Sequence, residues 1–221
     1  MKHVVIIGAG GHGREVLDIL RHQMERTSDL SVLGFIDETP DTAGKMIDGA
    51  EILGDWDWFE TADLDNVYVV CAVGKPAVAA RLAERANSLD LSFINVISPL
   101  AYISPFATLA HGVAVFPNVI VNTGVSVGSH CILNVGSTVS HDTKIGRYSN
   151  INPGAHLAGN VSIGEGCYIG MAANVIQGTS IGEGTVIGAG ATVIRDTPAN
   201  VTAVGVPARV IRKREQDCHA R

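Results

Sequence analysis

The sequence predicts a small α/β domain followed by a parallel β-helix, a solenoid in which short strands wind around a triangular prism. Three observations lead to this fold class. An aliphatic residue recurs at every sixth position from Ile97 to Val193, seventeen times without interruption. Small or β-branched residues occupy most positions four residues after the aliphatic one. Before Ile97, apolar runs of strand length instead alternate with helical patterns.

The six-residue period fits neither a helix nor simple alternation along one strand. It describes a short strand, a turn and another short strand on the next face of a prism. Three faces of six residues make an 18-residue coil, and successive coils stack about 4.8 Å apart. The aliphatic series then fills the axis of the prism as a continuous core. We therefore expect residues 94–221 to form one β-helix domain with a C-terminal tail.

Residues 1–93 are expected to form a Rossmann-like domain, because strand-type and helix-type segments alternate along them. The unit is roughly half of a full dinucleotide-binding fold. The expected strands cover residues 3–7, 31–37, 66–74 and 92–97, and the expected helices cover residues 14–24 and the segment that begins at Pro76.

A glycine-rich turn joins the first expected strand to the first expected helix. There, the spacing of Gly8, Gly10 and Gly13 indicates phosphate binding, because amides at a helix N-terminus face the anion and missing side chains let it approach. Asp37, at the end of the second strand, could accept a hydrogen bond from a ribose hydroxyl. The small size of the domain favours a nucleotide sugar as the ligand. A redox dinucleotide and a purely structural turn are the alternative interpretations.

The 18-residue period also places residues above one another at the corners of the prism. His141 falls in a corner turn, with Thr123 one coil below and Gly159 one coil above. We expect the bare glycine to leave room for a ligand that lies along the rod. Asp142 follows His141 and could fix its tautomer and raise its basicity. We therefore predict His141 as a general base and Asp142 as its acidic partner.

The other histidines and cysteines have simpler interpretations. We expect His111, His130 and His156 to be solvated surface residues. Cys131 and Cys167 fall at the small inward position of the repeat, so they are expected to fill the core rather than act as nucleophiles. The spacing of cysteines and histidines matches no zinc pattern, and no metal is expected.

Composition and charge argue against several classes of function. The formal net charge is -6 and no basic stripe occurs, so nucleic acid is not an expected partner. The apolar runs are shorter than the 18 or more residues, roughly, that a membrane span needs. A strand begins almost directly after Met1, without a signal-type segment before it. We therefore expect a cytoplasmic protein with no membrane association.

Three motifs resemble those of the nucleotide-sugar acyltransferases that modify amino sugars: GAGGHGREV near the N-terminus, His141-Asp142 within the repeat, and the segment GVPAR that begins at Gly205. This family includes the bacillosamine and perosamine N-acetyltransferases and a branch named for sialic acid O-acetylation. The resemblance covers nearly the whole chain. It implies a left-handed β-helix, whereas ordinary parallel crossovers are right-handed. It also implies acetyl-CoA as acyl donor and a homotrimer with active sites between neighbouring rods.

The resemblance further implies roles for individual residues at matching positions of its motifs. Asn150 stands where the bacillosamine type has a second histidine, and this difference favours the perosamine type. The positions that match substrate-binding ones are Gly10, Gly11, His12, Asp37, Glu38, Gly74 and Asn134. The positions expected to line the acyl-donor site are Asn150, Gly159, Ala189, Gly190 and Pro207, the last within the segment from Val204 to Arg209.

The resemblance thus predicts an acetyl-CoA-dependent N-acetyltransferase that acts on the amine of a nucleotide-linked 4-amino sugar, GDP-perosamine or a similar compound. His141 would act as general base in a direct attack, Asp142 would orient it, and a backbone amide near Gly159 would stabilise the oxyanion. Two alternatives stay open: a sugar O-acetyltransferase of the sialic acid type and a non-catalytic, sugar-nucleotide-binding trimer. The sequence does not separate GDP from UDP as the nucleotide.

Overall fold

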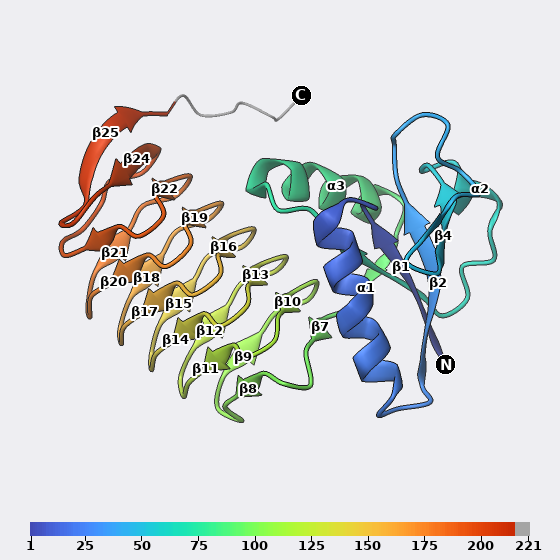
Figure 1. The fold of residues 1–221 in the computed structure, drawn as a ribbon, viewed down its shortest axis with the longest axis horizontal. Coiled ribbons are helices and arrows are strands. Elements are labelled where there is room, and N and C mark those ends of the chain that lie inside the picture. The colour runs from blue at the N-terminus through green and yellow to red at the C-terminus, as the bar shows by residue number, and fades with distance from the viewer. Residues whose placement is uncertain (215–221) are drawn as a thin grey trace.

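The computed structural model describes residues 1–214 as an α/β domain followed by a rod of stacked coils (Figure 1). The α/β domain has a six-stranded sheet in the order β3-β4-β2-β1-β5-β6, parallel except for the β3–β4 hairpin. None of the helices within residues 1–214 has the length and apolar character needed to cross a membrane. The strands are β1 (Lys2–Ile7), β2 (Leu30–Ile36), β3 (Met46–Ile47), β4 (Ala50–Gly54), β5 (Val67–Cys71) and β6 (Ser92–Phe93), and the helices are α1 (Gly11–Met24), α2 (Trp58–Thr61) and α3 (Pro76–Ser88).

The observed order of strand, glycine turn and helix agrees with the sequence prediction, but the structure adds three elements. β3, β4 and α2 lie in a stretch to which the apolar pattern assigned no element. β3 spans only two residues and α2 only four, so hydrophobic periodicity has no room to show in either. The predicted strand over residues 92–97 is divided, because its first half joins the α/β sheet and its second half begins the rod.

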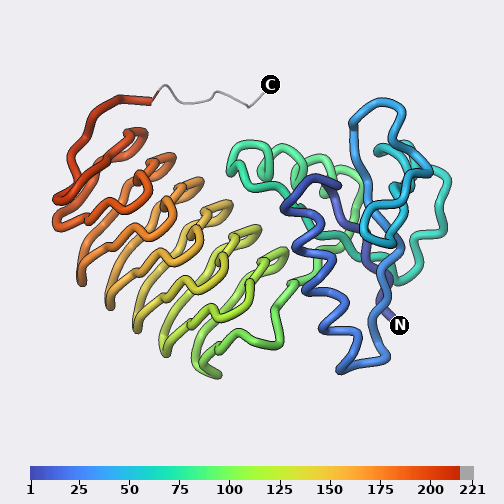
Figure 2. The backbone as a smooth tube through the Cα atoms, in the orientation of Figure 1, coloured from blue at the N-terminus to red at the C-terminus, as the bar shows by residue number. Residues whose placement is uncertain are grey.

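The rod has three sheets of parallel strands as its faces, and its coils are stacked along it (Figure 2). Each coil contributes a two-residue strand to each face, except that the last coil contributes none to face 3 within the described residues. Partner residues are 18 apart, as Val115 and Leu133 are. Face 1 contains β7 (Val96–Ile97), β10 (Ala114–Val115), β13 (Ile132–Leu133), β16 (Asn150–Ile151), β19 (Tyr168–Ile169) and β22 (Val186–Ile187). Face 2 contains β8 (Tyr102–Ile103), β11 (Ile120–Val121), β14 (Thr138–Val139), β17 (His156–Leu157), β20 (Asn174–Val175) and β23 (Thr192–Val193). Face 3 contains β9 (Thr108–Leu109), β12 (Ser126–Val127), β15 (Lys144–Ile145), β18 (Ser162–Ile163) and β21 (Ser180–Ile181).

The core of the rod is the aliphatic series that the repeat predicts. Every member of the series from Val115 to Val193 is buried, and those of the first coil are partly buried. Cys131 and Cys167 are fully buried, which confirms their assignment to the core. Burial raises the pKa of the Cys131 thiol to about 12 and that of the Cys167 thiol to about 11. Both thiols are therefore protonated and inaccessible at neutral pH.

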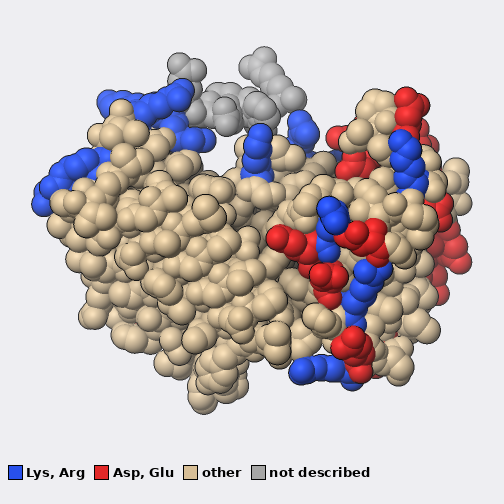
Figure 3. Space-filling view, viewed as in Figure 1, with Lys and Arg blue, Asp and Glu red and all other residues tan. Residues whose placement is uncertain are grey.

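The C-terminal end of the rod is a β-hairpin, within the segment that the sequence analysis named only as a C-terminal tail. β24 (Val201–Val204) extends face 1, and β25 (Arg209–Lys213) pairs with it in an antiparallel hairpin. The hairpin covers the last coil, where the six-residue period has already ended. All five residues of β25 are exposed, and basic side chains gather at this end of the molecule (Figure 3). Cys218 and His219 lie outside the described residues.

The α/β domain packs against the first coils of face 1. Outward-pointing residues of this face, such as Val96, Ala114 and Ile132, are buried although their strands lie at the surface of the rod. They belong to the same hydrophobic cluster as Val16 and Leu20 of α1. One continuous core therefore joins the two parts, and it holds the glycine turn in place beside the rod.

His130 lies at this junction and corrects one sequence expectation. Its side chain is buried, at 4% exposure, rather than solvated. The positive φ of 58° at His130 turns its ring onto the preceding coil, where Phe93 of β6 meets it edge-on and Tyr148 stacks on it at 5.2 Å. Burial, followed by repulsion from His111, lowers the pKa of His130 to about 4. A repeat position alone does not reveal that another domain covers the turn.

Acidification is expected to destabilise the fold through His130. The unfolded chain binds a proton at the ordinary pKa of 6.5, whereas the folded chain binds it only near pH 4. Between these values the unfolded state holds more protons, so the free energy of unfolding falls as the pH falls, by at most about 3 kcal/mol. The His130→Phe variant keeps an aromatic ring without the titration and should lose this part of the dependence. Urea denaturation of both proteins at pH values from about 7 to about 4 measures it; equal slopes would contradict the assignment.

Candidate active site

His141 and Asp142 form a hydrogen-bonded pair in the turn between β14 and β15, at the corner where face 2 meets face 3 (corner 2–3). His141 Nδ1 lies 3.0 Å from Asp142 Oδ2, and the side chains are 50% and 60% exposed. A carboxylate can only accept, so Nδ1 carries the proton in this pair. The neutral imidazole then has an unprotonated Nε2, which can take a proton from a bound substrate. The sequence places His141 and Asp142 next to each other without showing whether their side chains meet, and in the structure they do.

Gly159 lies directly above His141, as the 18-residue period predicts. A Cβ at this position would overlap Nε2 and Cε1 of the imidazole, so only glycine fits against the ring. The expected space for a ligand is therefore occupied by the histidine itself, which is a correction. The Gly159 N–H donates to no group within residues 1–214, and it remains available beside the imidazole.

The glycine turn presents backbone amides at the start of α1. Gly13 packs so closely on the Gly8 carbonyl that a Cβ there would overlap it, and the Gly8 N–H donates to the Ile36 carbonyl at 2.8 Å. A Cβ on Gly10 or Gly11 would meet nothing within 4 Å. The helix begins without a side-chain cap, so its first N–H groups face open space and can bind an anion.

Asp37 holds this turn through both carboxylate oxygens. Oδ2 accepts the Ala9 N–H at 2.7 Å, and Oδ1 accepts the Thr39 N–H at 2.9 Å. Partial burial raises the pKa of the Asp37 carboxyl, but hydrogen bonds from Thr39 and Ala9 outweigh this effect and leave the pKa below its ordinary value. Asp37 is therefore ionised. A ribose hydroxyl, its predicted partner, would have to bind a carboxylate that already accepts two backbone hydrogen bonds.

The neighbouring predicted residues are also engaged by protein groups. Glu38 accepts from Arg85 of α3 at 2.7 Å, and the guanidinium lies over the ring of Trp56. The Asn150 side chain donates to the Gly74 carbonyl at 2.6 Å. Asn150 is predicted to contact the acyl donor and Gly74 the nucleotide, yet the structure joins them directly. This hydrogen bond links β16 of the rod to the loop after β5.

His12 connects the glycine turn to the rod. Its ring stacks on Phe116 at a centroid distance of 5.1 Å and an interplanar angle of 14°. Burial lowers the pKa of His12, although Glu15 partly offsets the effect. Phe116 follows β10 at the corner between faces 1 and 2 (corner 1–2), and Asn134 occupies the same position one coil later. Sequence reasoning missed Phe116, whose only signal is an aromatic residue in a column that otherwise contains serine, asparagine and glycine.

The predicted site residues therefore form two groups on one chain. The first group, at corner 2–3, contains His141, Asp142 and Gly159. Face 2 separates the two corners, so the groups do not meet within one chain. The second group lies at or beside corner 1–2 and contains the glycine turn, Asn134, Ala189 and Gly190, with Pro207 in the β24–β25 turn beyond them.

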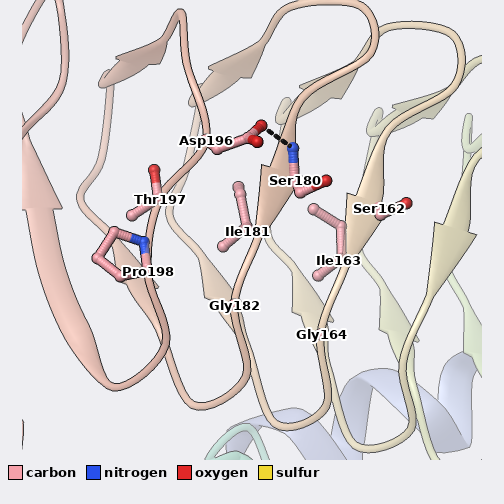
Figure 4. A pocket seen from close by; sticks show the side chains of 9 residues that line it. All are labelled: Ser162, Ile163, Gly164, Ser180, Ile181, Gly182, Asp196, Thr197 and Pro198. Atoms are coloured by element: carbon pink, nitrogen blue, oxygen red, sulfur yellow. Dashed lines mark hydrogen bonds between the residues drawn. The ribbon is translucent and has the colours of Figure 1, made fainter.

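A shallow groove on face 3 lies apart from both groups (Figure 4). Its rim includes Ser162 and Ser180, and Asp196 accepts the Ser180 N–H at 2.8 Å. None of the predicted site residues lines it. Residues 1–214 also contain no cluster of three His, Cys, Asp or Glu side chains placed to hold a metal ion.

Two family models match the chain. The PglD N-terminal domain matches residues 3–86, and the bacterial transferase hexapeptide repeat matches residues 142–177 and 160–195. GDP-perosamine N-acetyltransferase of Escherichia coli O157:H7 is 32% identical over 143 residues, which are 64% of this chain and 63% of the relative. The chain thus matches a little less than two thirds of this curated relative.

Solved structures match over almost the full length. A variant of perosamine N-acetyltransferase from Caulobacter crescentus, in complex with CoA and GDP-perosamine, has a TM-score of 0.88 and 34% identity, covering 96% of this chain and 98% of that one. The acetyltransferase domain of PglB from Neisseria gonorrhoeae, in complex with acetyl coenzyme A, has a TM-score of 0.87 and 30% identity, covering 95% and 99%. These matches confirm the left-handed β-helix. The chain therefore belongs to the hexapeptide-repeat nucleotide-sugar acetyltransferases with a PglD-type N-terminal domain, the family of the perosamine N-acetyltransferases.

Proposed function

We propose that the protein transfers the acetyl group of acetyl-CoA to the amine of a nucleotide-linked 4-amino sugar, GDP-perosamine or a close analogue. The observation that carries this proposal is the His141–Asp142 hydrogen bond, which leaves an unprotonated Nε2 on the surface of the rod. Relatives of the chain bind CoA and GDP-perosamine. Acetyl-CoA and nucleotide sugars are cytoplasmic metabolites, so we place the reaction in the cytoplasm.

The proposed chemistry is a direct attack in a ternary complex. The neutral sugar amine attacks the thioester carbonyl carbon while His141 Nε2 takes a proton from its nitrogen. The Gly159 N–H supports the oxyanion of the tetrahedral intermediate. The intermediate collapses with cleavage of the carbon–sulfur bond, and protonated His141 returns this proton to the leaving thiolate. The buried thiols of Cys131 and Cys167 are unsuited to an acyl-cysteine route.

The α/β domain is proposed to hold the nucleotide. The open N–H groups at Gly10 and Gly11 suit the diphosphate, and Asp37 keeps the turn in shape. His12 rests on Phe116 beside this turn, and Asn134 follows one coil later. A nucleotide bound at the turn can therefore direct its sugar along corner 1–2, toward Asn134.

A homotrimer would complete the site. The first coils of face 1 are covered by the α/β domain, and face 3 presents mainly hydroxyl side chains to solvent. The view in Figure 3 shows hardly any charged side chains over the rod. When three rods turn face 2 toward a common axis, corner 2–3 of one rod meets corner 1–2 of the next. Large exposed apolar residues gather on face 2 and its two corners: Leu100, Tyr102, Phe106, Ile120, Val135, Met171, Ile176 and Ile194.

The His141→Asn variant tests the proposed function. General-base assistance contributes about 10²- to 10⁴-fold, so turnover should fall by about this factor while nucleotide-sugar affinity is retained. The assay follows thiol release from acetyl-CoA with GDP-perosamine, and product analysis separates N- from O-acetylation. The exposed His22 of α1 supplies the control, His22→Asn, which should behave like wild type. Undiminished turnover in His141→Asn would exclude the assigned base, and a non-catalytic binding protein would release no thiol at all.

A charge on face 2 tests the trimer. Ile120 is 41% exposed on this face, and Ile120→Lys would place an ammonium group in a rod-to-rod contact, where burying it is costly. Light scattering should show three chains for wild type and fewer for the variant. Ser126→Lys, on face 3, is the matched control and should remain trimeric. A trimer unaffected by Ile120→Lys would show that face 2 is not the interface.

A further inference from the structure

We propose that Gly124 is a positioning residue of the active site, because its missing side chain lets the Asp142 carboxylate reach His141. Gly124 lies in the corner 2–3 turn one coil below Asp142. This inference rests on the proposed function and assigns a role to a residue that no motif of the family resemblance includes.

The geometry at this corner leaves no space for a side chain. Asp142 has a φ of 61°, which turns its carboxylate back onto the preceding coil. A Cβ on Gly124 would lie 2.5 Å from Asp142 Oδ1 and 3.4 Å from Cγ. The other oxygen, Oδ2, holds His141 Nδ1 at 3.0 Å. A methyl group at position 124 must therefore displace the carboxylate that fixes the histidine tautomer.

A glycine one coil below a side chain at positive φ also occurs elsewhere in the rod. His130 also has a positive φ, of 58°, and a Cβ on Gly112, one coil below, would lie 2.5 Å from its Nδ1. Ala172 has a similar φ of 54°, but its side chain is only a methyl group. A Cβ on Gly154, one coil below Ala172, would meet nothing within 4 Å. At these positions the clearance therefore accompanies the long side chain of Asp142 or His130 in the turn above, and the turn with Ala172 does not use it.

Gly124 and Gly159 hold the pair from both sides. Gly159, one coil above His141, makes room for the imidazole, and Gly124, one coil below Asp142, makes room for the carboxylate. The two side chains lean in opposite directions along the rod and meet through the Nδ1–Oδ2 hydrogen bond. Each glycine therefore sets the position of one partner.

The chain offers a matched control for the test. Gly124 has a φ of 70°, so alanine there adds backbone strain as well as a clash with Asp142. Gly166, at the corner between faces 3 and 1, has a φ of 63°, and a Cβ there would meet nothing within 4 Å. Gly166→Ala therefore introduces similar strain without the clash. Gly124→Asn supplies a second variant, because asparagine adopts positive φ readily yet still fills the space.

The experiment combines Gly124→Ala, Asp142→Asn and the double variant with the Gly166→Ala control. Gly124→Ala should lower kcat by the same factor as Asp142→Asn, with KM nearly unchanged. The upper limit of this factor is the whole contribution of general-base assistance, about 10²- to 10⁴-fold. The pH profile of kcat/KM should change in the same way in both. The double variant should lose no further activity, because both changes break one hydrogen bond. Gly124→Asn should have the same kinetics as expected for Gly124→Ala, and it replaces the alanine variant if that variant folds poorly. Gly166→Ala should keep wild-type kinetics.

Two kinetic results would overturn the proposal. One is equal kinetics of Gly124→Ala and Gly166→Ala, and the other is a double variant whose losses multiply. Nitrogen NMR of the His141 ring supplies a readout without turnover: Gly124→Ala should shift its tautomer as Asp142→Asn does. An inactive wild-type protein in which that shift still occurs would reject the proposed function and retain the role of Gly124, whereas an unshifted ring would reject the role of Gly124.

Discussion

The stacking of coils at a repeat of 18 residues is the constraint on which the rest of the structure depends. Parallel strands pair residue for residue along all three faces, as Ile132 pairs with Asn150 and Thr138 with His156. Backbone hydrogen bonds thereby link each coil to the next, and the aliphatic series of successive coils forms one continuous core. Because each coil packs only on its neighbours, the position of any turn residue follows from its place in the repeat.

This regularity explains how the side chains of two adjacent residues, the proposed catalytic pair His141 and Asp142, can meet. A corner turn gives Asp142 a positive φ, which points its side chain along the rod, and neighbouring coils stand close enough for a single methyl group to clash. Rigid stacking therefore fixes the position of both side chains relative to the coils above and below. Glycines in the coils above and below provide the space, and the hydrogen bond provides the orientation.

The three faces of the rod differ in what they contact. The first coils of face 1 are covered by the α/β domain, which brings the glycine turn and His12 to corner 1–2. The same packing buries His130 and joins Asn150 to Gly74, so the α/β domain and the rod share both a core and a polar contact. Face 2 and its two corners lie between the two groups of predicted site residues and carry large exposed apolar side chains such as Ile120 and Met171, so we propose the subunit contact there.

Contacts at a constant sequence separation could be read from the sequence alone. The aliphatic axis, the buried cysteines and the stacking of His141 against Gly159 all follow from the six- and 18-residue periods, since a solenoid converts sequence distance directly into spatial distance. Tertiary structure alone decided the hydrogen bonds of Asp37, the stacking of His12 on Phe116, the burial of His130 and the β24–β25 hairpin. These contacts join segments that have no repeat relationship, so no period in the sequence encodes them.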